Sequence, residues 1–165
     1  RKFPVSLGLL IAGTFVTPEE RVQFDRLASQ PGTAGLIQYF GFVSGAQKNQ
    51  LLREADMFCF PTYYANENHP VNLIEAMAFG LPILTTRWRS IPELFPVDYP
   101  GLVDTQSPEE IANVMPALML LDFSHVRSSL PRLLGRRPAK PTYVSPAPNN
   151  VSDSKSAIAE FPVVP

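Results

Sequence analysis

Two glutamates, Glu67 and Glu75, stand eight positions apart on either side of a predicted helix start. Pro70 suits the first turn of that helix, because its missing N–H would have no intrahelical partner there. Glu75 lies among apolar residues of the predicted helix 71–79, which we expect to be buried nearly all round, so its carboxylate needs a hydrogen bond or a cleft. Two interpretations stay open: a carboxylate that reaches solvent or a backbone amide, and one that accepts the hydroxyl groups of a polar ligand.

The helix start at Pro70 is also a candidate anion site. Free N–H groups and the helix dipole favour negative charge at this end of a helix. Since Pro70 has no N–H, the donors would be Val71, Asn72 and His69. A phosphate at this point, with carboxylates on both sides for hydroxyl-bearing groups, predicts a nucleotide-sugar as the ligand.

Other chemistry is weakly represented in the sequence. There is no G-x-G-x-x-G, Walker, G-x-S-x-G or H-E-x-x-H motif. The single cysteine, Cys59, excludes an intrachain disulfide and a cysteine-cluster metal site, and its apolar neighbours indicate a core thiol. His69 and His125 cannot build a metal site by themselves, so we expect neither a metal nor a cofactor. With no long apolar run and no signal peptide, we expect a soluble, cytoplasmic protein.

Apolar runs alternate with helical patterns along the first three quarters of the chain. This order indicates right-handed crossovers and a parallel sheet with helices on both faces, in which ligands bind outside the carboxyl ends of the strands. Thr17–Glu20, Ser44–Gln47 and Ser107–Glu110 have the pattern of helix-capping boxes. The predicted strands are 5–15, 36–43, 57–60, 81–86 and 100–103. The predicted helices are 18–30, 45–55, 71–79 and 108–121, and residues 87–94 are predicted to form a loop that leads into a short helix.

The net charge of −1 hides an asymmetry that predicts a boundary near Phe123. Residues 1–123 have a balance of −5, whereas residues 124–165 have a balance of +4 and seven of the 18 prolines. We therefore expect a domain over 1–123 and a Pro-rich basic tail over 124–165 that is mostly disordered. Basic residues in such a tail could contact nucleic acid or an acidic membrane surface, but a solvated tail without a specific partner is the favoured interpretation.

The segment around the two glutamates resembles the retaining glycosyltransferases of family four. Glu67 and Glu75 have that family's E-x7-E spacing, followed by A-M-A-x-G-x-P. Leu51–Phe58 is similar to its L-L-x-x-A-D-V-F, Phe40–Val43 to its F-x-G-x-V, and Ile91–Glu93 to its I-P-E. The resemblance covers about residues 7–121 and implies the Rossmann-like C-terminal half of a GT-B fold, the half that binds the nucleotide-sugar donor.

The resemblance implies a role for each matching residue. Glu75 would bind the ribose hydroxyls, and Glu67 would face the transferred sugar. The amides of His69 to Asn72, including Val71, would face the phosphates. The backbone of Phe42 and Val43 would hold the edge of the base, which leaves uridine, guanosine and adenosine diphosphates open.

Three departures from the family pattern stand out. Asn68-His69 replaces Gly-Phe before Pro70, which adds polar groups where the sugar would sit. The segment 87–90, with Arg89, replaces D-V-G-G; it would contact an anionic acceptor or the diphosphate, or form a solvated loop. The third departure is an absence. We expect the sequence to lack three parts of the family pattern: the first strand of the C-terminal half, the Arg/Lys pair that binds the diphosphate, and the N-terminal half that binds the acceptor.

We therefore expect the donor-binding part of a retaining glycosyltransferase that is inactive by itself. Its partner would be a nucleoside diphosphate sugar, with a sugar, a glycan or a lipid-linked acceptor; no nucleic acid is expected, and a peripheral membrane contact stays open. The alternatives are a nucleotide-sugar epimerase or phosphorylase on the same fold, and a non-catalytic flavodoxin-like module that binds a partner.

Overall fold

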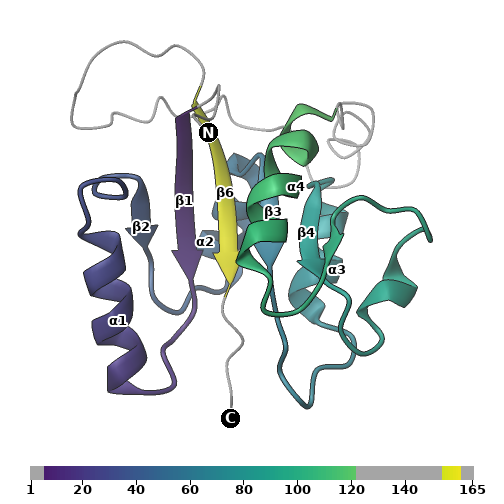
Figure 1. Ribbon diagram of the computed structural model, residues 1–165, viewed down its shortest axis with the longest axis horizontal. Coiled ribbons are helices and arrows are strands. Elements are labelled where there is room, and N and C mark those ends of the chain that lie inside the picture. Colours follow the sequence, from purple (N-terminus) through teal and green to yellow (C-terminus); the bar gives the residue numbers. More distant parts are fainter. Residues whose placement is uncertain (1–5, 122–153, 161–165) are drawn as a thin grey trace.

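Six strands form one sheet in the order β2-β1-β6-β3-β4-β5 (Figure 1). The computed structural model describes residues 6–121 and 154–160. Every pairing between neighbouring strands is parallel. The strands are β1 Ser6–Ala12, β2 Ile37–Tyr39, β3 Met57–Phe60, β4 Ile83–Thr86, β5 Leu102–Val103 and β6 Ser154–Glu160.

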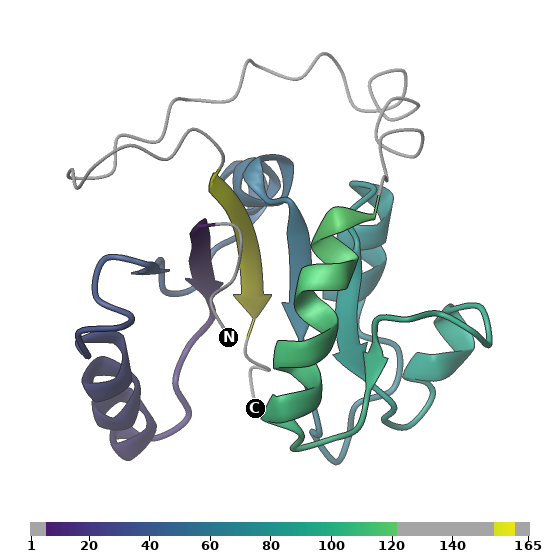
Figure 2. The ribbon, with the colours of Figure 1, turned by 45° about the horizontal axis from the view of Figure 1, so that its top comes forward.

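Helices cover both faces of this sheet, as the sequence predicts. Helix α4 (Pro108–Leu120) packs on β4 and β5 at the front in Figure 1. Helices α2 (Gly45–Glu54) and α3 (Val71–Ala78) lie behind the sheet and contact β6, β3 and β4. Helix α1 (Pro18–Ala28) lies beside the β2 edge (Figure 2). None of its residues is buried. A short 3-10 helix, η1 (Ile91–Leu94), follows β4.

The core is built around β3 and β4, whose residues are all buried. Side chains alternate between the two faces, as they must along a strand: Phe58 and Phe60 join the cluster beneath α2 and α3, whereas Met57 and Cys59 join the cluster beneath α4. Burial raises the pKa of the Cys59 thiol to about 12. Cys59 is therefore a core thiol, as predicted, and not a nucleophile.

Strand β6 lies in the middle of the sheet, where no strand was predicted. It pairs with β1 along its whole length and with β3 through residues 157–159. In the common doubly wound strand order 3-2-1-4-5-6, β6 occupies the position of strand 1. The predicted disorder of residues 124–165 is thus wrong for 154–160, so the sheet extends beyond the predicted 1–123 domain. The remainder of the predicted tail lies outside the described residues.

Glycines end the first two strands earlier than the apolar runs indicate. Strand β1 ends at Ala12, before Gly13 with a φ of 136°, and β2 ends at Tyr39, before Gly41 with a φ of 66°. Both values lie in the region that favours glycine, so the chain leaves the extended conformation there. The predicted strands 5–15 and 36–43 are correct in place and too long.

Helix α3 is less buried than its apolar sequence predicts. Leu73 and Ala76 are buried against the sheet, but Val71, Ile74 and Met77 are 65%, 47% and 38% exposed. The exposed residues recur every third position, so they form one outward stripe. The expectation of a helix buried nearly all round is wrong, because within the described residues a single layer of strands packs against it.

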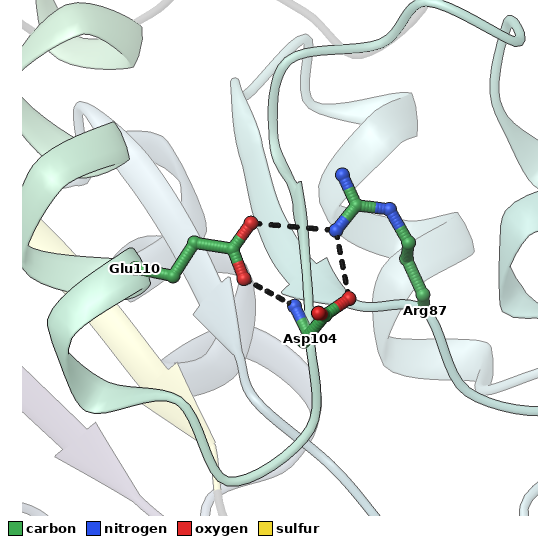
Figure 3. A network of polar contacts seen from close by, with 3 residues as sticks. All are labelled: Arg87, Asp104 and Glu110. Atoms are coloured by element: carbon green, nitrogen blue, oxygen red, sulfur yellow. Dashed lines mark hydrogen bonds and ion pairs between the residues drawn. The ribbon is translucent and has the colours of Figure 1, made fainter.

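One of the three predicted capping boxes forms. Thr17 and Glu20 cap α1 reciprocally, whereas the side chains of Ser44 and Ser107 cap neither α2 nor α4. Figure 3 shows where the Glu110 carboxylate goes instead: it accepts the amide of Asp104 at 2.7 Å and pairs with Arg87 at 3.4 Å. Arg87 also pairs with Asp104 at 3.0 Å, so this network joins the end of β4 to the start of α4.

Gly101→Ala should destabilise the fold by roughly 1–3 kcal/mol, because an added methyl group would have to displace core atoms. An ideal Cβ there would lie 2.0 Å from the carbonyl oxygen of Ile83 and 2.6 Å from the ring of Tyr99. The Tyr99 hydroxyl donates to that carbonyl at 2.8 Å, so the clash also disturbs a hydrogen bond. Urea denaturation measures the loss. Gly32→Ala is the control, since nothing lies within 4 Å of its Cβ position; equal stability of the two variants would contradict the prediction.

Candidate functional site

The predicted site residues lie in the loops and helix starts that follow β2, β3 and β4. In a parallel sheet the carboxyl ends of all strands meet at one edge, which is where ligands bind in doubly wound folds. The segment from Pro61 to Pro70 joins β3 to α3 and carries Glu67 and His69. Glu75 follows inside α3, and Arg89 lies in the turn after β4.

Glu75 forms an ion pair that the sequence analysis did not find. Both of its carboxylate oxygens accept hydrogen bonds from Nζ of Lys48, at 2.8 and 2.7 Å. The side chains of Lys48 and Glu75 are 22% and 34% exposed, so the pair is half-buried and open on one side. Lys48 precedes the buried Leu51 and Leu52 by three and four positions, which places it on the inward face of α2. That spacing was the signal available in the sequence.

Glu67 lies in the loop before α3 and is partly buried. Its amide donates to the carbonyl of Tyr64 at 3.1 Å, which shapes the loop. Burial raises the pKa of the Glu67 carboxyl, and a hydrogen bond from the backbone of Asn68 opposes this in part. A carboxylate that is partly desolvated interacts more strongly with polar groups than one in water does.

Hydrogen bonds from two residues, Trp88 and Ser90, hold the Glu67 loop to the turn after β4. Trp88 Nε1 donates to the Tyr64 carbonyl at 2.7 Å. Ser90 Oγ lies 2.5 Å from the Asn68 carbonyl oxygen and 2.9 Å from Asn68 Oδ1. These contacts fall on both sides of Glu67, so Trp88 and Ser90 fix the segment that presents its carboxylate. Neither role was predicted from the sequence.

Arg89 differs from Arg87 in its surroundings. Arg87 pairs with Asp104 and Glu110, in the network of Figure 3. Arg89 is exposed, and its guanidinium lies 5.5 Å from the centroid of the Trp88 ring. Its φ of 51° is uncommon for a residue other than glycine. In the chain, Arg89 lies between Trp88 and Ser90, the two residues that bind the Glu67 loop.

The start of α3 lies between the two glutamates in the chain. Pro70 is the N-cap and the helix begins at Val71, the first residue of the predicted helix 71–79. Within the described part of the chain, no side chain caps this end. The amides of Val71 and Asn72 lie in the first turn, where N–H groups have no intrahelical acceptor, so they can donate to a ligand.

Phe42 and Val43 lie at the same edge, in the loop after β2. The Gly13 amide donates to the Gly41 carbonyl at 2.8 Å, which ties this loop to the end of β1. Val43 is buried in the core, whereas Phe42 is 68% exposed. The loop thus has a fixed backbone and one exposed aromatic ring.

The structure brings the predicted residues into three places along this edge. Glu75 pairs with Lys48 of α2, the loop of Glu67 is joined to the turn that carries Arg89, and Phe42 and Val43 lie between β2 and α2. In residues 6–121 and 154–160 no group of three or more His, Cys, Asp or Glu is placed to hold a metal ion. The expectation that no metal or cofactor is needed stays a prediction.

The parallel sheet has the doubly wound strand order, and carboxylates and an uncapped helix start lie at its carboxyl edge. This is the architecture of α/β domains that bind ligands at that edge. A family model described as Glycosyl transferases group 1 matches residues 5–127. The chain belongs to this family, which confirms the resemblance to glycosyltransferases.

Three curated relatives have similar sequences. The amylovoran biosynthesis glycosyltransferase AmsK of Erwinia amylovora is 34% identical over 88 residues, 51% of this chain and 21% of that protein. Putative colanic acid biosynthesis glycosyltransferases WcaL are 31% identical over 112 residues in Escherichia coli and over 115 residues in Salmonella typhimurium. Those matches cover 65% and 67% of this chain and 27% of each relative. The chain thus matches about a fifth to a quarter of these relatives' length.

None of the helices in the described ranges, 6–121 and 154–160, is long and apolar enough to cross a membrane.

Proposed function

We propose that this chain binds the donor of a retaining glycosyltransferase of the GT-B fold, a nucleoside diphosphate sugar. The observation that supports this most is the placement of Glu67 and Glu75 on either side of the uncapped start of α3. A diphosphate suits the free N–H groups of a helix start, and carboxylates suit the hydroxyl groups of sugars.

Each residue then has a role in this proposal. Glu75 accepts the ribose hydroxyls, and Glu67 accepts hydroxyls of the transferred sugar and is the residue nearest the reaction. Amides from His69 to Asn72, including Val71, bind the phosphates. The backbone at Phe42 and Val43 binds the base edge, and Arg89 contacts an anionic group of the diphosphate or the acceptor.

Transfer itself needs more than donor binding. The acceptor, which we propose to be a sugar, a glycan or a lipid-linked sugar, must be held against the donor while water is excluded. Because the chain matches only about a quarter of its relatives' length, we expect little or no transfer by the 165-residue chain alone. We place the activity in the cytoplasm, with the acceptor reached in solution or at a membrane surface.

A calorimetric titration of the chain with UDP, GDP and ADP tests the proposal. We expect saturable binding of one of the three, because a shaped site for the base edge distinguishes the bases. No binding of any nucleotide by a chain that is folded by circular dichroism would contradict the proposal.

Glu67→Gln separates the sugar end of the site from the nucleotide end. The variant should bind the selected nucleoside diphosphate as the wild type does, because Glu67 is assigned to the sugar. It should lose about 10-fold in affinity for the corresponding nucleotide-sugar, since a hydrogen bond to a charged group contributes roughly 1.5–3 kcal/mol. Equal loss for both ligands would contradict the assignment of Glu67.

A further inference from the structure

In the described part of the chain, a single charged side chain, that of Lys48, binds both oxygens of the Glu75 carboxylate. It comes from the first turns of α2, whereas Glu75 comes from α3, so the contact joins two helices on the same face of the sheet. Helix α2 packs on β6, and α3 packs on β3 and β4. The pair therefore crosses the centre of the sheet, where the strand order changes direction.

A contribution to folding stability explains the Lys48–Glu75 pair only weakly. Lys48 and Glu75 keep 22% and 34% of their side-chain surface exposed, and ion pairs with access to water contribute little to the free energy of folding. The sheet beneath them is already held by the buried residues Leu52 and Leu73. The geometry of the pair, in contrast, restricts the position of the Glu75 carboxylate.

The Glu75 carboxylate has hydrogen-bond acceptor positions that Lys48 does not occupy. A carboxylate has about four acceptor positions, two on each oxygen. Nζ of Lys48 takes one on each oxygen, at 2.8 and 2.7 Å, and so leaves one on each. Two acceptors on one carboxylate match two neighbouring hydroxyl groups, and the exposed third of Glu75 gives a ligand access to them.

We propose that Lys48 is a positioning residue that holds the Glu75 carboxylate so that its two remaining acceptor positions face the hydroxyl groups of the ligand. This inference rests on the proposed function of Glu75. Lys48 acts through Glu75 and does not touch the ligand itself.

Lys48→Met and Lys48→Arg test the proposal, with binding of UDP, GDP and ADP each followed by protein-observed NMR titration up to millimolar nucleotide. Lys48→Met should weaken binding of the selected nucleotide about 10-fold, the effect of a coupling between neighbouring residues. Lys48→Arg should restore most of the loss, because a guanidinium can also bind both carboxylate oxygens. Arg21→Met, which removes the exposed pair with Asp25 on α1, is the matched control and should bind as the wild type does.

A double-mutant cycle with Glu75→Gln distinguishes positioning from direct contact. In the Glu75→Gln background, Lys48→Met should cause no further loss, because Lys48 acts only through the carboxylate. A full additional loss there would show that Lys48 binds the ligand directly and would overturn the proposal. Wild-type affinity in Lys48→Met would also overturn the proposal about Lys48, but it would leave the proposed function of the chain intact. Failure of the wild-type chain to bind any of the three nucleotides would refute both.

Discussion

Ile158→Pro should destabilise the protein by about 3 kcal/mol or more, a large part of the 5–15 kcal/mol by which domains are usually stable. Ile158 lies in β6 and pairs with Leu10 of β1 on one side and Phe58 of β3 on the other. Proline removes a backbone N–H and is excluded from central strands. In the described residues β6 is the sole link between β2-β1 and β3-β4-β5, so its loss divides the sheet in two.

Urea denaturation followed by circular dichroism measures this effect. Ile158→Val is the matched control, because it keeps the backbone N–H and a β-branched side chain that suits a strand. It should unfold close to the wild-type urea concentration. If Ile158→Pro also unfolds at the wild-type urea concentration, β6 does not contribute to the stability of the sheet.

The position of β6 could not be predicted from the sequence. Residues 154–160, with Ser, Lys and Glu among small apolar residues, have no clear alternation and follow a proline-rich segment. The strand forms because β1 and β3, far away in the sequence, provide a hydrogen-bonding edge on each side. Such pairing is a tertiary effect that a local pattern does not contain.

Strands β3 and β4 are predictable because all of their residues are buried. The runs at 57–60 and 81–86 are continuously apolar or β-branched, as strands of a parallel sheet covered on both faces must be. The capping box predicted at the start of α4, in contrast, could not be predicted correctly from its spacing. Ser107 and Glu110 have the spacing of a capping box, but Glu110 binds Arg87 and the Asp104 amide instead.

The candidate site was partly predictable. Glu67 and Glu75 could be selected because carboxylates near an apolar helix need a reason to be there. Lys48 could not be assigned to Glu75, since 27 positions separate them and only the packing of α2 beside α3 brings them together. The same holds for Trp88 and Ser90, whose partners Tyr64 and Asn68 lie in another loop.

Glu75→Gln should weaken binding of the selected nucleoside diphosphate about 100-fold. Two hydrogen bonds from ribose hydroxyls to a charged acceptor contribute roughly 1.5–3 kcal/mol each, and an amide replaces the charged oxygens with one neutral acceptor and one donor. The variant also leaves the half-buried Lys48 without its carboxylate partner. Calorimetry on the wild type and NMR titration on the variant cover this range of affinities.

Glu93→Gln is the matched control, because Glu93 is an exposed carboxylate of η1 near the same edge of the sheet and should not affect binding. A 2′-deoxynucleoside diphosphate adds a test from the side of the ligand. The wild type should bind it about 10-fold less tightly than the ribonucleotide, for one lost hydrogen bond to a charged group. In Glu75→Gln this preference should disappear, because the charged acceptor of that hydroxyl is gone. If the preference survives the substitution, the ribose binds elsewhere, and the Lys48–Glu75 pair is an element of the fold and not of the site.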